Sequence, residues 1–122
     1  MNLPHLEPLI FAKEILFKSP DRVEVKCEFL TLPTLAMCIE AAAQSCAAFD
    51  EESGNTLAFL TQSNDVRFLE KVEAVSFVFF VHKEVEVAGY KKFFFEVYDP
   101  ITKQKVVSGK LTLSVQKQVK GA

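Results

Sequence analysis

The sequence predicts an α+β domain in which a curved sheet of about six strands surrounds one long helix. One central segment is apolar on nearly all sides, and most of the remaining chain is rich in Val, Phe, Thr and Tyr. With 122 residues the chain has room for one hydrophobic core. A helix without a polar face must be covered all round, and in a domain this small a curved sheet can do so.

The helix is predicted at residues 34–49. Pro33 precedes it, a residue that is tolerated in a first helical turn. Its strongly polar side chains are Glu40, Gln44 and Ser45, so apolar surface covers most of its circumference. At 1.5 Å per residue the helix would be roughly 24 Å long.

Six further segments have the composition of strands. The first two are separated by Lys-Ser-Pro-Asp at residues 18–21, a turn-forming cluster that predicts a hairpin. The predicted strands are residues 9–17, 22–29, 56–68, 74–87, 90–98 and 105–116.

Side-chain parity predicts the register of the hairpin formed by residues 74–98. A three-residue loop at 87–89, with a positive φ at its glycine, places Phe79 opposite Val97 and Glu84 opposite Lys92. A two-residue turn would shift this register by one residue and pair apolar with polar side chains. The longer loop is therefore predicted. The side chains then expected to face the helix are Phe77, Phe79, Val81, Phe93, Phe95, Leu111 and Leu113.

Composition and charge limit the partners of the chain. Fourteen basic and sixteen acidic residues give a net charge of −2, which disfavours nucleic acid and anionic membranes. The start lacks the pattern of a secretory signal and no segment is long enough to span a membrane, so the cytoplasm is expected. Cys27, Cys38 and Cys46 are scattered, with no spacing typical of a metal site; we expect buried thiols and no bound metal.

Glu40 is the main catalytic candidate. A carboxylate in the middle of an apolar helix is costly to desolvate unless it is hydrogen-bonded, paired or used as an acid or base. Gln44 lies one turn later on the same face and is predicted to help bind the substrate. Glu40 could equally emerge at a sheet edge or dimer seam and meet a Lys or Arg; the pattern itself favours neither interpretation.

Three segments carry a resemblance to a known family. Glu-Ala-Ala-Ala-Gln at residues 40–44 resembles the Glu-Ala-Met-Ala-Gln segment of the β-hydroxyacyl-acyl-carrier-protein dehydratases. Leu-Pro-His at residues 3–5, followed by Pro8, resembles the opening of that family, and residues 64–68 resemble its strand ending in Ala-Arg-Phe. The likeness covers almost the whole chain in the right order.

The resemblance implies a hotdog fold, a curved antiparallel sheet around one long central helix. It also implies a homodimer that holds acyl tunnels between its subunits. The expected ligand is an acyl thioester on acyl-carrier protein or coenzyme A, with no resident cofactor. Glu40 matches the helix carboxylate that acts on the β-hydroxyl group, and the backbone near Arg67 and Phe68 would line the thioester path.

The sequence departs from the family where the catalytic histidine belongs. The family carries it in a Gly-His-Phe-Pro segment before the helix, whereas residues 27–33 are Cys-Glu-Phe-Leu-Thr-Leu-Pro. Loss of a general base costs roughly 10² to 10⁴ in rate. His5 and His82 are secondary candidates: His5 matches a family position that is not catalytic, and His82 is expected on the sheet face away from the helix.

Thr34 is a further binding candidate because its hydroxyl stands at the helix N-terminus, where backbone N–H groups favour an oxyanion. A simple capping role is the alternative.

Three functional classes follow. The chain could be an enzyme on acyl thioesters, either dehydratase-like or a thioesterase that uses Glu40 as base or nucleophile. It could instead be a non-catalytic acyl-coenzyme A or acyl-carrier-protein binder. A cone-shaped α+β protein of the nuclear-transport-factor or cystatin kind is disfavoured, because its helix would need a polar outer stripe.

Overall fold

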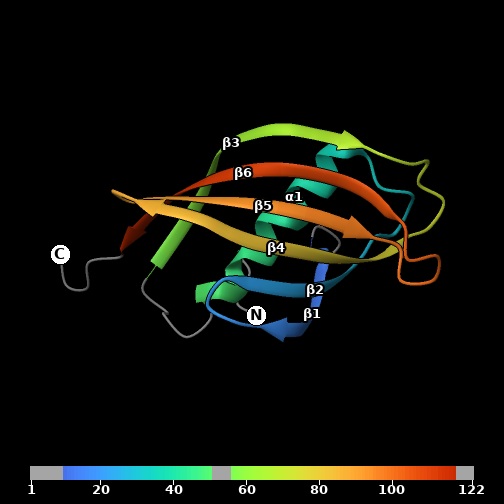
Figure 1. The fold of residues 1–122 in the computed structure, drawn as a ribbon, viewed down its shortest axis with the longest axis horizontal. Helices are drawn as coiled ribbons and strands as arrows, with labels where there is room; N and C mark the ends of the chain where they lie inside the picture. Colours follow the sequence, from blue (N-terminus) through green and yellow to red (C-terminus); the bar gives the residue numbers. More distant parts are fainter. Residues whose placement is uncertain (1–9, 51–55, 118–122) are drawn as a thin grey trace.

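The computed structural model describes residues 10–50 and 56–117, and it has one six-stranded antiparallel sheet curved around one helix (Figure 1). The strand order is β1-β2-β4-β5-β6-β3, which makes β1 and β3 the two edges. The predicted architecture is confirmed. The elements are β1 Ala12–Lys18, β2 Arg22–Glu28, α1 Leu35–Cys46, the 3₁₀ turn η1 Ala47–Asp50, β3 Thr56–Phe68, β4 Ser76–Val87, β5 Tyr90–Tyr98 and β6 Lys105–Lys117.

The core lies between the sheet and α1. Alanine side chains let the helix approach the sheet closely, and Ala41 and Ala42 are fully buried. Large aromatic rings fill the space from the strand side, with Phe79 and Phe95 stacked at a centroid distance of 6.4 Å. All seven side chains predicted to face the helix are buried, as expected from their alternation along the strands.

The helix is covered on most of its circumference, although the sequence predicts complete coverage. Ala36 is exposed, and Glu40, Ala43 and Ala47 are partly exposed at helical spacing. They form a stripe along α1 and the first residue of η1, and this stripe stays accessible because the sheet is open at its edges. The same stripe carries the candidate carboxylate. Among the described residues, no helix is long and apolar enough to cross a membrane.

The turn between β4 and β5 differs from the predicted loop. It has two residues, Ala88 and Gly89, both with positive φ (48° and 86°), and it joins Val87 directly to Tyr90. Positive φ at both central residues is typical of a type I′ turn, whose twist matches that of the flanking strands. The prediction of a three-residue loop is therefore wrong.

The predicted register nevertheless holds over most of this hairpin because a bulge compensates for the shorter turn. Lys83 pairs with Phe93, but Val85 pairs with Lys92, so Glu84 is the extra residue. Beyond the bulge the partners are those predicted, including Phe79 with Val97. The expected pairing of Glu84 with Lys92 is wrong.

Gly109 of β6 lies under a bulge in the edge strand β3. The pairing of β3 with β6 is irregular between Asn64 and Arg67, and a Cβ at position 109 would lie 2.6 Å from Val66 Cγ2 and 2.9 Å from Phe95 Cε1. A glycine is needed here because two side chains occupy the space that a methyl group would take.

We expect Gly109→Ala to lower the free energy of unfolding by about 1–3 kcal/mol, the usual cost of overpacking a core. The neighbouring atoms belong to a β-branched side chain and an aromatic ring, which have little freedom to move aside. Urea unfolding followed by circular dichroism measures the change. Wild-type stability in this variant would contradict the close packing.

The buried cysteines are expected to be unreactive. Burial raises the pKa of the Cys27 and Cys38 thiols to about 12. At pH 8 this leaves roughly 10³-fold less thiolate than a thiol with a pKa of 9.0 would have. An aromatic disulfide reagent should therefore label the three cysteines slowly in the folded protein and rapidly in denaturant. Fast labelling of the native protein would contradict this burial.

Candidate functional site

Glu40 and Gln44 lie side by side on α1. Gln44 Nε2 donates a hydrogen bond to Glu40 Oε1 at 3.4 Å. Glu40 is partly exposed on the helix stripe, whereas Gln44 is only 3% exposed. The expectation that these side chains share one helix face is confirmed, and the carboxylate is positioned where a ligand could reach it.

Gln44 also connects the helix to the start of β1. Its Oε1 accepts hydrogen bonds from the backbone N–H groups of Phe11 (2.8 Å) and Ala12 (3.2 Å). The sequence predicts Gln44 as a substrate-binding residue, but the structure uses its amide oxygen for the backbone. The sequence does not predict this contact, because every residue except proline offers the same backbone N–H group.

Thr34 caps the helix. Its Oγ1 accepts a hydrogen bond from Met37 N at 3.2 Å, and Met37 Sδ accepts one from Thr34 N at 3.5 Å. Of the two interpretations of Thr34, the structure shows the capping one. Thr34 lies six residues before Glu40, about 9 Å along the helix at 1.5 Å per residue.

An open hollow of about 560 Å³ lies at the N-terminal end of α1. Phe68, the last residue of β3, is 45% exposed and contributes to its wall. Arg67 is exposed and is not part of this wall. The other lining residues come from two loops without a motif, so the sequence does not predict their role. The lining is Leu32, Pro33, Phe68, Leu69, Glu70, Lys71 and Val72.

The loop that precedes the helix is apolar at its tip. Leu30 is 80% exposed and Leu32 is 55% exposed. This is the segment in which the resembled family carries its histidine. Two leucines therefore project from a place where a base would be expected.

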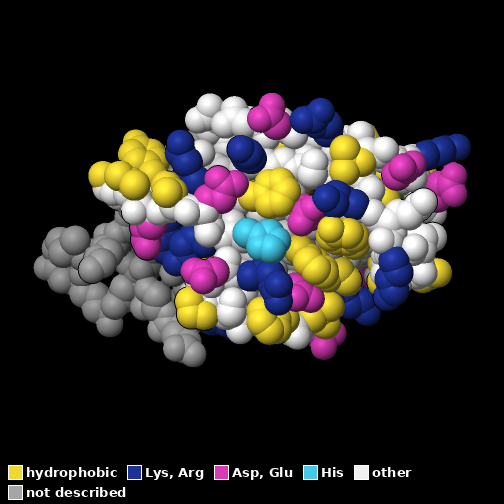
Figure 2. Space-filling view, viewed as in Figure 1, with side chains coloured by type: hydrophobic (Ala, Val, Ile, Leu, Met, Phe, Trp, Pro, Cys, Tyr) yellow, Lys and Arg dark blue, Asp and Glu magenta, His cyan; other side chains and the backbone are white. Residues whose placement is uncertain are grey.

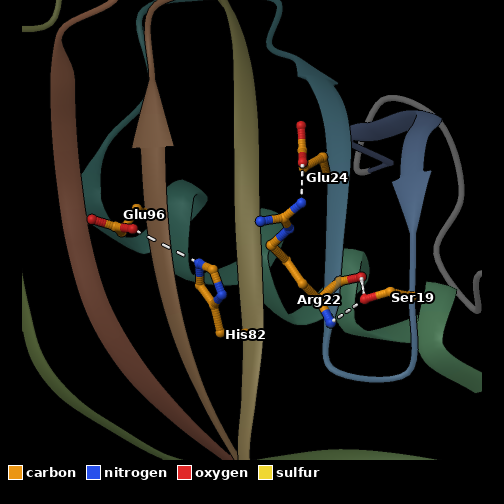
Figure 3. Close-up of polar contacts among 5 residues, drawn as sticks. All are labelled: Ser19, Arg22, Glu24, His82 and Glu96. Carbon is orange, nitrogen blue, oxygen red and sulfur yellow. Dashed lines mark hydrogen bonds and ion pairs between the residues drawn. The ribbon is translucent and has the colours of Figure 1, made fainter.

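His82 lies on the outer face of the sheet, as predicted. Its Nε2 is 3.8 Å from Glu96 Oε1, and its ring stacks on Phe94 at a centroid distance of 5.9 Å. Lys105 also pairs with Glu96. Figure 3 shows His82 and Glu96 in front of the sheet with the helix behind it, and Figure 2 shows charged and hydrophobic side chains interspersed over this face. The sheet separates His82 from Glu40. His5 lies outside the described residues.

The neighbouring outer-face contacts join β2 to the β1–β2 turn. Arg22 Nη2 is 3.3 Å from Glu24 Oε2, and the Arg22 backbone N–H donates to Ser19 Oγ at 3.1 Å (Figure 3). The Arg22 guanidinium also lies 4.6 Å from the centre of the Phe17 ring. These contacts stabilise the first hairpin and are remote from α1.

Comparison with solved structures identifies the fold. A subunit of the dehydratase heterocomplex ApeI:P from Xenorhabdus doucetiae superposes with a TM-score of 0.73 at 17% identity, over 97% of this chain and 89% of that one. A thioesterase from Haemophilus influenzae has a TM-score of 0.71 at 11% identity, over 88% and 80% of the two chains.

The chain has the hotdog fold. A Streptococcus mutans protein bound to acetyl coenzyme A is similar too, with a TM-score of 0.68 at 16% identity over 95% of this chain and 99% of that one. No family model and no curated protein matches the sequence. Within the hotdog fold, Glu40 occupies the central helix, on the stripe that the sheet leaves accessible.

Proposed function

We propose that this hotdog protein processes acyl thioesters of acyl-carrier protein or coenzyme A, with Glu40 as its acid–base group. The observation that carries the proposal is a partly exposed carboxylate, held by Gln44, on the central helix. The names of similar structures support it: one is a dehydratase complex, one a thioesterase and one was solved with acetyl coenzyme A.

The hollow at the N-terminal end of α1 suits the pantetheine arm of such a substrate. Its walls are mainly apolar side chains from two loops, and its size is within the range of small-molecule sites. Phe68 links the hollow to β3, consistent with a thioester path along that strand. The substrate would bring its own pantetheine, so this chemistry needs no resident cofactor.

A homodimer is part of the proposal. The edge strand β3 runs for 13 residues and pairs with β6, and no strand of the described chain pairs with its other side. Such an edge favours pairing with another chain. Exposed Leu60 and Phe68 on β3, together with Leu30, would be covered in a dimer.

Pairing with a different hotdog chain is the second candidate. The described residues place no histidine beside Glu40, because His82 is on the other face of the sheet. A subunit that supplies a carboxylate would then need a base from elsewhere to remove an α-proton. One similar structure is a dehydratase heterocomplex, which supports this candidate.

Hydrolysis of the thioester is the alternative chemistry. A single carboxylate can activate water or attack the thioester carbonyl, and neither step requires the missing histidine. A protein that binds acyl-coenzyme A without turnover is the third outcome.

The three free, buried cysteines are in keeping with a reducing compartment, and we propose a cytoplasmic location.

One assay separates these functions. The purified protein is incubated with 3-hydroxyacyl, enoyl and saturated acyl thioesters, while enoyl absorbance and free thiol are followed together. A change in enoyl absorbance identifies a dehydratase, and released thiol identifies a thioesterase. If neither signal moves but the ligands raise the melting temperature, the enzyme proposal fails and the binder remains. If nothing binds, acyl-thioester recognition itself is wrong.

A further inference from the structure

We propose that Gln44 is a positioning residue, which uses hydrogen bonds from the backbone N–H groups of Phe11 and Ala12 to direct its amide group at the Glu40 carboxylate. This inference rests on the proposed function for its consequence in catalysis. The geometry itself rests on the hydrogen bonds of the Gln44 side chain with Phe11, Ala12 and Glu40.

The hydrogen bonds determine which way the Gln44 amide faces. The N–H groups of Phe11 and Ala12 both donate toward one end of the amide, at 2.8 and 3.2 Å. An oxygen must stand there, because an NH₂ group would leave two donors facing a donor. The NH₂ group is therefore turned toward Glu40 Oε1, 3.4 Å away.

The parts that hold Gln44 are themselves well packed. Phe11 is buried and its ring lies 4.9 Å from that of Phe29, while its backbone oxygen accepts a hydrogen bond from Glu28 N at 2.9 Å. On the helix, Ala41 is fully buried beneath the same turn. Gln44 thus holds the partly exposed Glu40 carboxylate in a fixed position relative to the start of β1.

An amide suits this task because it orients a carboxylate without adding charge. A Lys or Arg in its place would pair with the Glu40 carboxylate and hold it in the ionised form. A neutral donor leaves the carboxylate able to exchange a proton with a substrate. Gln44 itself therefore orients the carboxylate without fixing its charge.

Gln44→Glu separates positioning from folding. Its carboxylate keeps an oxygen for the two N–H groups of β1 but replaces the NH₂ donor with a second acceptor near Glu40. We expect the fold to be retained and kcat to fall about 10- to 100-fold, the cost of a misplaced catalytic group, with KM changed less than about threefold. The pH profile should also change, because two adjacent carboxylates would share a proton. Gln44→Met should lower the melting temperature as well, since it leaves two buried N–H groups without an acceptor.

Nuclear magnetic resonance of the side-chain NH₂ groups tests the geometry without any turnover. The Gln44 pair, assigned by its loss in Gln44→Met, should shift in Glu40→Ala and stay in place in Glu84→Ala, the same change at an exposed residue of β4. If Glu40→Ala leaves the Gln44 signals unmoved, the positioning role is wrong. If they shift but the wild-type protein turns over no thioester, the proposed function fails while the positioning stands. Wild-type kcat and pH profile in Gln44→Glu, in an active enzyme, would also overturn the role.

Discussion

Turnover of acyl thioesters is expected to fall about 10²- to 10⁴-fold in Glu40→Gln, the usual contribution of a general acid or base. The amide has the shape of the carboxylate and can still accept the hydrogen bond from Gln44 through an oxygen. It exchanges no proton at neutral pH. The loss should therefore appear in kcat, measured by enoyl absorbance or free thiol.

Binding provides the internal check for this variant. Acyl-coenzyme A should raise the melting temperature of Glu40→Gln about as much as that of the wild type, because the hollow at the helix N-terminus is unchanged. Glu14→Gln is the matched control, an identical change at an exposed position of β1. Full activity in Glu40→Gln would assign the chemistry to another group, and His5→Ala would be the next variant to examine.

The largest change in stability is expected from Phe95→Ala, about 3–5 kcal/mol in the free energy of unfolding. Phe95 is fully buried and stacks on Phe79 with nearly parallel rings. Its ring edge also closes the space above Gly109. Removing the ring leaves a cavity at the centre of the sheet, where the surrounding strands have little room to collapse.

Urea unfolding measures this loss, with Ile101→Ala, at an 88% exposed residue, as a control that should stay within about 0.5 kcal/mol of wild type. The double variant with Gly109→Ala adds a sharper test. Part of the clash at position 109 involves the Phe95 ring, so Gly109→Ala should cost less when that ring is absent. Strictly additive effects would show that the two residues do not share this space.

The hairpin of β4 and β5 shows what side-chain parity can predict and what it cannot. The pairing of Phe79 with Val97 follows from the sequence because a shifted register would place polar groups in the core. The turn and the bulge at Glu84 are invisible to that argument, since a shorter turn plus one extra residue produces the same register. Side-chain parity predicts which side chains point toward the core. It does not predict whether the extra residue lies in the turn or in a bulge within the strand.

The sequence by itself determined the single core, the strand segments, the apolar helix and the carboxylate upon it, because these depend on local composition and periodicity. Side-chain parity already placed His82 on the outer face of the sheet, whereas the tertiary structure alone decided that Glu40 lies on the open stripe of α1. It also decided that the Gln44 oxygen binds β1. These features join segments far apart in the chain, and such contacts arise only when the sheet closes around the helix.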